Sequence, residues 1–366
     1  MEHRLIKVGI SHGDINGIGY EVIIKSLMDN VINELCVPIV YGSPKVAAYH
    51  RKALDIDNFS FNNIKTADDA NQKRANMINC LDDDVRVELG KSTKNSGEAA
   101  VISLKRAVED LKSGKLDVLV TGPIDKHNVQ SESFQFPGHT EYLKSEFGVE
   151  EALMFMVSES MKIGIVTGHV PLTNVPELIT EESVVGKIRM MNYSLQYDFA
   201  IRKPRIAVLG LNPHAGDNTL LGMEEKKSIT PAIQKSQQEG ILSFGPFSAD
   251  GFFGAGLFTN FDGILAMYHD QGLTAFKALS FDTGVNFTAG LPVIRTSPVH
   301  GTAFSLAGKG EASENSFRHA IFLAIDIYRN RELYDEISKN PLHHQEIDIL
   351  SDHVDELPPE IQNSET

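Results

Sequence analysis

Three histidines in this sequence each follow a short apolar, β-rich segment: His169, His214 and His269. They are 45 and 55 residues apart, so no local metal-binding motif contains them. Three neutral imidazoles that leave one coordination position open are a typical ligand set for a catalytic divalent metal, and nitrogen donors favour Zn²⁺. We therefore expect either a shared metal site or, in the simpler interpretation, three unrelated histidines in one cleft.

Residues suited to anion binding form a second group. His139 and Thr140 directly precede a predicted helix that begins near Glu141, and a helix N-terminus with a hydroxyl and an imidazole suits a phosphate. Three further polar residues occur at spacings of nine in a segment rich in glycine and β-branched residues: Lys277, Asn286 and Arg295. In an acidic protein, bases beside a histidine-rich loop indicate a positive pocket for an anionic substrate, although scattered surface charges would give the same pattern.

The elements that must position these side chains alternate along the chain. Strands are predicted at residues 6–11, 37–41, 117–121, 162–167, 205–211 and 263–268. Helices are predicted at residues 18–27, 44–54, 97–111, 181–197 and 224–238. This order predicts an α/β fold with a largely parallel sheet and helices on both faces. In such sheets ligands bind beyond the carboxyl ends of the strands, which is where the three histidines stand.

The composition excludes several classes of protein. The 366 residues include 34 Lys and Arg and 49 Asp and Glu, a net charge of −15, which argues against a basic face for nucleic acid or anionic lipid. With only two cysteines, a disulfide framework and a four-thiolate zinc site are excluded. No apolar run approaches the roughly 20 residues of a membrane span, and no signal-peptide pattern is present. We therefore expect a cytoplasmic protein without membrane or nucleic-acid partners.

Acidic residues are concentrated at the C-terminal end. Residues 331–366 contain ten acidic residues and two basic ones, so we expect a solvated or partly helical extension outside the core. Five apolar residues there would share one helical face, which leaves docking on the body or on a partner open: Ile347, Ile349, Leu350, Val354 and Leu357.

Common nucleotide-binding and nucleophile motifs are absent or misplaced. No G-x-G-x-x-G follows a predicted strand, so the Rossmann dinucleotide fingerprint is missing. The tripeptide Gly90-Lys91-Ser92 lacks the earlier glycine of a P-loop, because Val85 stands there. The G-x-S-x-G pattern at residues 9–13 follows the first strand, whereas a nucleophile elbow normally follows several.

Longer stretches are more specific. In chain order they are Gly13-Asp14 with Gly17-Ile18-Gly19 and Glu21; Thr121-Gly122-Pro123-Ile124 with Lys126; Gly138-His139-Thr140-Glu141; His169 with Pro171-Leu172; Leu211-Asn212-Pro213-His214-Ala215-Gly216; Gly222 with Glu224-Glu225; Ala266-Met267-Tyr268-His269-Asp270-Gln271-Gly272; and Gly290-Leu291-Pro292, Ile294-Arg295-Thr296-Ser297 and His300-Gly301-Thr302-Ala303. Together these stretches resemble the 4-hydroxythreonine-4-phosphate dehydrogenase family of the pyridoxal 5′-phosphate pathway, over roughly residues 5–330. The family's first loop usually reads T-P-G-D-P-A-G-I-G-P-E, and this chain has His12, Ile15 and Tyr20 at its proline positions.

The resemblance implies two α/β/α domains with a cleft between them, similar to isocitrate and isopropylmalate dehydrogenases, which bind NAD without the Rossmann glycines. The first domain would comprise residues 1–134 and 306–330, the second 135–305, and the acidic extension 331–366. The resemblance also implies a homodimer with active sites at the subunit interface. By resemblance, the metal ligands are His169 and His214 of one subunit and His269 of the other, and the substrate contacts are His139, Thr140, Lys277, Asn286 and Arg295.

The implied reaction is the NAD- or NADP-dependent oxidation of 4-phosphooxy-L-threonine to 2-amino-3-oxo-4-phosphooxybutanoate, which decarboxylates to 3-amino-2-oxopropyl phosphate. It implies one divalent metal per site, with Zn²⁺ favoured and Mg²⁺ or Co²⁺ as alternatives. Lys277 and Asp250 are candidates for the residue that takes the alcohol proton, and Asp250 is equally suited to orient a metal-binding histidine.

Two other functions are compatible with these residues. A related dehydrogenase would act on another phosphorylated hydroxy acid, such as 4-phosphothreonate or 4-phosphoerythronate, with the same metal and phosphate groups. A non-catalytic protein that binds a phosphorylated metabolite would keep the fold, but it would be expected to lose some of the three histidines or some of Lys277, Asn286 and Arg295, all of which are present.

Overall fold

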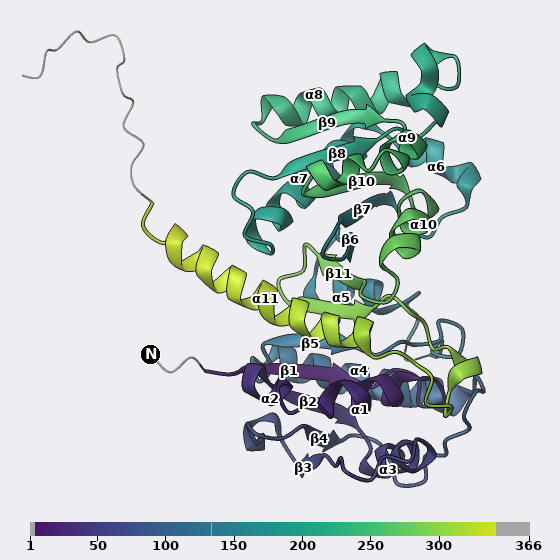
Figure 1. Cartoon of the computed structure of the whole chain (residues 1–366), viewed down its shortest axis with the longest axis vertical. Coiled ribbons are helices and arrows are strands. Elements are labelled where there is room, and N and C mark those ends of the chain that lie inside the picture. Colours follow the sequence, from purple (N-terminus) through teal and green to yellow (C-terminus); the bar gives the residue numbers. More distant parts are fainter. Residues whose placement is uncertain (1–3, 133, 342–366) are drawn as a thin grey trace, which may run out of the picture.

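Twelve strands form one mixed sheet in the computed structural model, which describes residues 4–132 and 134–341 (Figure 1). In sheet order the strands are β3 (Asn62–Ile64), β4 (Asn76–Asn79), β2 (Cys36–Gly42), β1 (Ile6–Ser11), β5 (Val118–Thr121), β12 (Ile294–Pro298), β11 (Val285–Ala289), β6 (Leu153–Val157), β7 (Lys162–Thr167), β10 (Gly263–Tyr268), β8 (Arg205–Leu209) and β9 (Leu242–Phe247).

The sheet consists of two parallel blocks joined by an antiparallel centre. The block from β3 to β12 is parallel throughout, and so is the block from β7 to β9. Between them, β11 pairs antiparallel with β12 and β6, and β6 pairs antiparallel with β7. The predicted α/β class is therefore confirmed, and the antiparallel centre is a feature that the sequence did not predict.

Helices cover both faces of the sheet (Figure 1). Their bounds are α1 (Gly19–Leu27), α2 (Ile32–Leu35), α3 (Pro44–Ala53), α4 (Lys94–Lys112), α5 (His139–Phe147), α6 (Val175–Leu178), α7 (Glu181–Tyr197), α8 (Thr230–Gln238), α9 (Ala249–Gly254), α10 (His269–Ser280) and α11 (Asn315–Ser338).

The central strands are apolar at nearly every position because both of their faces are covered. Val118 and Val120 of β5 belong to the apolar cluster that contains Phe317 of α11. Leu119, between them, belongs to another cluster, together with Leu104 of α4. Successive strand residues point to opposite faces, so α11 and α4 cover opposite sides of β5.

Local capping explains where the long helices begin. Thr93 accepts a hydrogen bond from the Ser96 amide, and the Ser96 hydroxyl lies 3.4 Å from the Thr93 amide, so a capping box starts α4 three residues before the predicted position. The same arrangement of Thr180 and Ser183 starts α7, whose observed bounds match the prediction. The predicted helix 224–238 is a π-helical turn, Glu225–Ile229, followed by α8.

The residues that stand where the family has prolines are fully buried. The exposed fraction of His12, Ile15 and Tyr20 is 0%. The ring of Tyr20 is stacked between those of His12 and His50, with centroids 5.1 Å apart on each side. Its hydroxyl accepts a hydrogen bond from the Ser43 amide at 3.0 Å. Packing against neighbouring rings therefore holds the first loop in place of the constraint that proline would supply.

Helix α11 continues beyond residue 330, so the predicted boundary of the acidic extension lies inside it. Residues 331–338 remain attached to the body: Arg331 Nε donates to Asp198 Oδ1 at 2.7 Å, and the Tyr334 ring packs edge-on against Tyr197. The predicted apolar face at residues 347–357 lies outside the described residues. Within residues 4–132 and 134–341, no helix is long and apolar enough to cross a membrane.

Candidate active site

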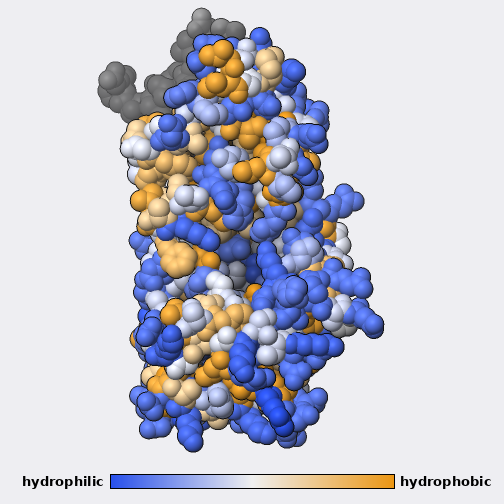
Figure 2. Space-filling model, turned by 90° about the vertical axis from the view of Figure 1, so that its right-hand side faces the viewer, coloured by the Kyte–Doolittle hydropathy of each residue, from blue (hydrophilic) through white to orange (hydrophobic). Residues whose placement is uncertain are grey.

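A hydrophilic pocket of about 300 Å³ lies where the two blocks of the sheet meet. Figure 2, which shows the right-hand side of Figure 1, has a hollow with hydrophilic residues at mid-height. Seven of the nine predicted site residues line the pocket: His139, Thr140, His169, His269, Lys277, Asn286 and Arg295. The other two, His214 and Asp250, are not among its lining residues.

Arg295 supplies a buried positive charge at the pocket. It lies on β12 and is 3% exposed. Its guanidinium donates to the Thr121 hydroxyl at 3.0 and 2.7 Å and to the Thr288 hydroxyl at 3.4 Å. No carboxylate of the described residues forms an ion pair with it, and burial lowers the pKa of Arg295 to about 10. An anionic ligand would therefore supply the missing counter-charge.

Several buried polar atoms at the pocket have no hydrogen-bond partner within the part of the chain that the structure describes. They include Nε2 of His139, Oδ1 of Asn286 and Nε2 of His300, all on residues that line it. Burial, followed by the charges of Arg295 and Lys126, lowers the pKa of His139 well below its usual range, so its imidazole is neutral. Buried polar groups normally have a partner, so these atoms indicate that the pocket holds a polar ligand or ordered water.

Two of the three histidines meet at the same pocket. Strands β7 and β10 are neighbours, with Thr167 paired to Tyr268, so the chain segments that leave them are at the same level of the sheet. The rings of His169 and His269 are consequently only 5.4 Å apart, centroid to centroid, within one chain. Two imidazoles at this distance are nitrogen donors of the type that Zn²⁺ and Co²⁺ accept.

His214 stands on the other side of His269 along the sheet edge. It follows β8, which pairs with β10, so the three histidines leave three consecutive strands. Residues 214–219 all have positive φ, a left-handed conformation that costs non-glycine residues roughly 1–2 kcal/mol each. Within residues 4–132 and 134–341, no group of three His, Cys, Asp or Glu side chains is arranged to hold a metal.

Helix α10 presents one face to the pocket. His269, Leu273 and Lys277 are four residues apart in succession, and all three line the cavity. Residues at this spacing lie on the same side of a helix. Asp250, in contrast, is the second residue of α9, and its carboxylate is fully exposed and accepts a hydrogen bond from Ser248. Of the two candidates for the alcohol proton, only Lys277 lies at the pocket.

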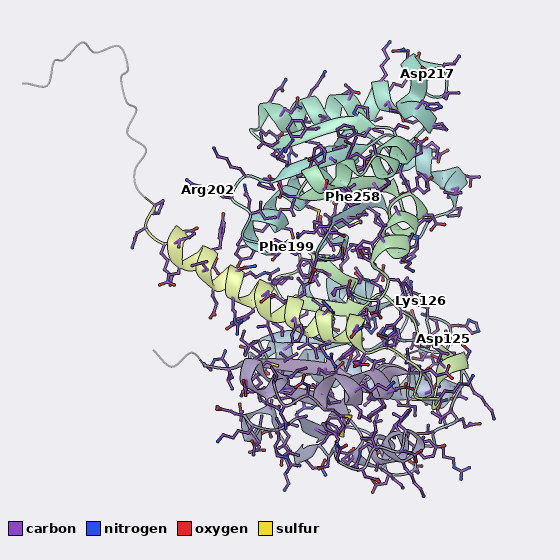
Figure 3. The ribbon with its side chains drawn as sticks, viewed as in Figure 1. Asp125, Lys126, Phe199, Arg202, Asp217 and Phe258 are labelled. Carbon is purple, nitrogen blue, oxygen red and sulfur yellow. The ribbon has the colours of Figure 1, made fainter. Side chains whose placement is uncertain are left out.

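Among the pocket residues that were not predicted as site residues, three have ionisable side chains: Lys126, Glu141 and His300. Lys126 Nζ lies 3.4 Å from His169 Nε2, at the level where the two halves of the molecule meet (Figure 3). Burial and then the charge of Lys126 lower the pKa of His169. All three residues belong to the stretches that resemble the family. Their ionisable side chains were the feature of the sequence that could have identified them as site residues.

The fold and the pocket together define an α/β protein with a pocket at the carboxyl ends of its strands that is lined by Arg295, Lys126 and Lys277. A model of the family described as "Pyridoxal phosphate biosynthetic protein PdxA" matches residues 34–324. The chain belongs to this family, which confirms the resemblance found in the sequence.

Relatives of known name agree with this assignment. The chain is 53% identical over 347 residues to 4-hydroxythreonine-4-phosphate dehydrogenase of Bacteroides thetaiotaomicron, which covers 94% of this chain and 95% of the relative. It is 40% identical over 324 residues to a putative D-threonate 4-phosphate dehydrogenase of Oceanobacillus iheyensis, which covers 87% and 97%. The crystal structure of a 4-hydroxythreonine-4-phosphate dehydrogenase from Burkholderia phymatum superposes with a TM-score of 0.73 at 36% identity, over 89% of this chain and 99% of that one. These relatives are dehydrogenases, as the sequence predicted.

Proposed function

We propose that this chain oxidises 4-phosphooxy-L-threonine with NAD⁺ or NADP⁺ in pyridoxal 5′-phosphate biosynthesis. The product, 2-amino-3-oxo-4-phosphooxybutanoate, then loses CO₂ to give 3-amino-2-oxopropyl phosphate. The observation that carries this proposal is the buried Arg295, which forms no salt bridge within the described residues, at a pocket that also contains Lys126 and Lys277, in a protein with a net charge of −15. A phosphorylated, carboxylated substrate is the class of ligand that this local positive charge would bind.

Different residues of the pocket would bind different groups of the substrate. Arg295 binds its anionic groups, while Thr140, Asn286 and the neutral His139 donate hydrogen bonds that fix its pose. Lys277 contacts the substrate from α10, and its amine takes the proton of the secondary alcohol as the carbon-bound hydrogen leaves as hydride. When bound, a divalent metal supplies Lewis-acid polarisation of the alcohol and the nicotinamide supplies the hydride acceptor.

We propose that His169, His214 and His269 hold this metal, with Zn²⁺ favoured and Mg²⁺ or Co²⁺ as alternatives. Their nitrogen donors and their positions after three neighbouring strands of the sheet support the proposal. The family resemblance assigns His269 to the second subunit, whereas in this chain its ring lies beside His169 of the same chain.

A mixed-dimer experiment distinguishes the two arrangements. Neither a His169→Ala nor a His269→Ala homodimer can complete a site. If the ligands come from two subunits, a dimer with one copy of each variant regains one intact site, and activity partly returns. If all three come from one chain, verified heterodimers stay inactive.

A homodimer with active sites at its interface is supported by the surface near the histidines. Apolar side chains that are 37–78% exposed lie on the segments that follow His169 and His214: Val170, Leu172, Leu178, Leu220, Leu221 and Met223. Exposed apolar residues gathered near a site are typical of an interface. Sedimentation equilibrium of the wild type and of a Leu172→Asp, Leu220→Asp variant tests this, with a monomeric wild type as the contrary result.

A second candidate substrate is favoured by the relative named for D-threonate 4-phosphate. The same cations would bind that phosphorylated hydroxy acid, so the substrate must be decided by turnover. The test is NADH formation with 4-phosphooxy-L-threonine, 4-phospho-D-threonate and 4-phosphoerythronate, each with and without a chelator. Turnover highest with the first compound and abolished by the chelator supports the proposal. Faster turnover of either acid that lacks the amine would show that the proposed substrate is wrong. Turnover unaffected by the chelator would show that the proposed metal dependence is wrong.

A further inference from the structure

The loop that carries His214 has a strained backbone. Residues 214–219 all have positive φ, within the 3-10 turn Pro213–Thr219. The amides of Ala215, Leu220 and Leu221 donate to carbonyls three to five residues earlier. A run of left-handed residues persists only where surrounding groups over-determine it. Contacts from outside the loop therefore add to the constraint that its own turn supplies.

The side chain of Glu225 occupies the inside of this loop. Glu225 begins the π-helical turn after the loop and is 6% exposed. Its Oε1 accepts hydrogen bonds from the Leu211 amide at 2.8 Å and the Asn212 amide at 2.7 Å, and its Oε2 accepts one from Asn212 Nδ2 at 3.0 Å. Carboxylates that accept backbone N–H groups form strong, charge-assisted hydrogen bonds.

Two glycines show how closely the backbone encloses this carboxylate. A Cβ added at Gly216, where φ is +85°, would lie 2.7 Å from Glu225 Oε2. A Cβ added at Gly210 would lie 3.2 Å from Oε1. The chain therefore passes the carboxylate both before and after His214. Among the described residues, no lysine or arginine pairs with Glu225, so its charge is stabilised by the amides it holds.

The neighbouring Glu224 holds a different part of the segment. Its side chain is half-buried, and its Oε2 accepts from the Asn212 side chain at 2.8 Å and from the Met223 amide at 2.9 Å. Within the described residues, no hydrogen bond joins it to the Leu211 or Asn212 amides, which donate to Glu225. Glu224 shares the Asn212 side chain with Glu225 but not these two amides, so it is a control for the effect of removing a carboxylate from this segment.

We propose that Glu225 is a positioning residue whose carboxylate sets the conformation of the loop at residues 211–219 and thereby the direction of the His214 imidazole. The part of this statement that concerns metal binding rests on the proposed function; the part that concerns the loop does not. Groups that orient a metal ligand commonly contribute 10- to 100-fold in metal affinity.

The test uses Glu225→Gln in the full-length protein, because glutamine keeps the size of the side chain. Its carbonyl can still accept the two backbone amides, but its NH₂ faces the Asn212 NH₂, and the charge is lost. We expect amide hydrogen exchange at Leu211 and Asn212 to rise at least about 10-fold, with exchange in β1 and β5 unchanged. We expect Co²⁺ affinity, measured by titration of its visible absorption, to fall about 10- to 100-fold.

Two further variants keep the outcomes separate. Glu224→Gln should leave both measurements within about 3-fold of the wild type, and His214→Ala should weaken Co²⁺ binding without faster exchange at Leu211. Wild-type exchange and affinity in Glu225→Gln would overturn the inference, as would faster exchange throughout the sheet, which would show a general structural role. If His214→Ala binds Co²⁺ like the wild type, the metal site proposed above fails, while the exchange at Leu211 still decides the role of Glu225 in the loop.

Discussion

Replacing Arg295 by methionine is expected to stabilise the unliganded protein and at the same time weaken its binding of phosphorylated substrate. The opposite signs follow from the surroundings of the guanidinium. It is 3% exposed, and within the described residues it donates to the hydroxyls of Thr121 and Thr288 and forms no salt bridge, so burial outweighs the attraction of the nearby Glu141 carboxylate. Methionine has a similar length, fills irregular space and carries no charge.

The size of the stability change follows from the same contacts. Burial lowers the pKa of Arg295 from about 12.5 to about 10, which corresponds to about 3 kcal/mol against the charged form. Removing the charge recovers that amount, while the two threonine hydroxyls lose a donor at a cost of roughly 1 kcal/mol. We expect Arg295→Met to raise the free energy of unfolding by about 1–3 kcal/mol, within the range seen when buried charges are replaced by apolar groups.

The expected loss of binding is of similar size. Losing charge-assisted hydrogen bonds costs roughly 1.5–3 kcal/mol, or about 10- to 150-fold in KM for the phosphorylated substrate. NAD⁺ affinity should change little. Arg295→Lys should not restore binding, because lysine lacks the planar fork of donors.

Urea unfolding with and without inorganic phosphate measures the first effect, and steady-state kinetics measure the second. Phosphate should stabilise the wild type more than Arg295→Met. Arg189→Met, on the surface beside Glu239, is the control and should leave KM unchanged. A less stable Arg295→Met protein with wild-type KM would refute the reasoning, because it would show that the guanidinium is compensated within the protein and that the phosphate lies elsewhere.

Three other predictions concern the histidines and the exposed lysine of the pocket. Burial lowers the pKa values of His12 and His50 to about 4, so only the unfolded chain takes up these protons as the pH falls from about 6.5 to 4. Urea unfolding should therefore show a free energy of unfolding that is fully present above pH 6.5 and falls by about 3 kcal/mol per histidine by pH 4. In His50→Gln the loss between these pH values should be smaller by the contribution of one histidine. His169→Ala and His269→Ala should each lower bound metal, measured by atomic emission, and lower turnover at least about 100-fold; either variant with full metal and full activity would contradict the site. Lys126→Ala should raise the substrate KM about 3- to 10-fold with little change in kcat, because the exposed ammonium of Lys126 lies beside the pocket. An unchanged KM would show that Lys126 does not contact the substrate.

The sequence alone was sufficient for the elements that local chemistry determines. The apolar runs of β1, β7 and β10 have observed bounds equal to the predicted ones, because strands buried on both faces need continuous apolar residues. The bounds of α7 were likewise predictable, since Thr180 caps its start. The rule that polar residues at strand exits converge also predicted that His169 and His269 lie at one edge of the sheet, and both line the pocket.

Long-range pairing decided what the sequence alone did not. The antiparallel strands β6, β11 and β12 are only five residues long, and their pairing brings Asn286 and Arg295, from adjacent strands, to the pocket. The neighbouring positions of β7 and β10 place His169 beside His269, while His214, on the left-handed turn at residues 214–219, is not among the residues that line the pocket. These arrangements depend on contacts between segments far apart in the chain, and their energies come from burial and hydrogen bonds that exist only once the sheet has formed. Residue type and spacing therefore identified the chemistry, and tertiary structure decided which of those residues meet.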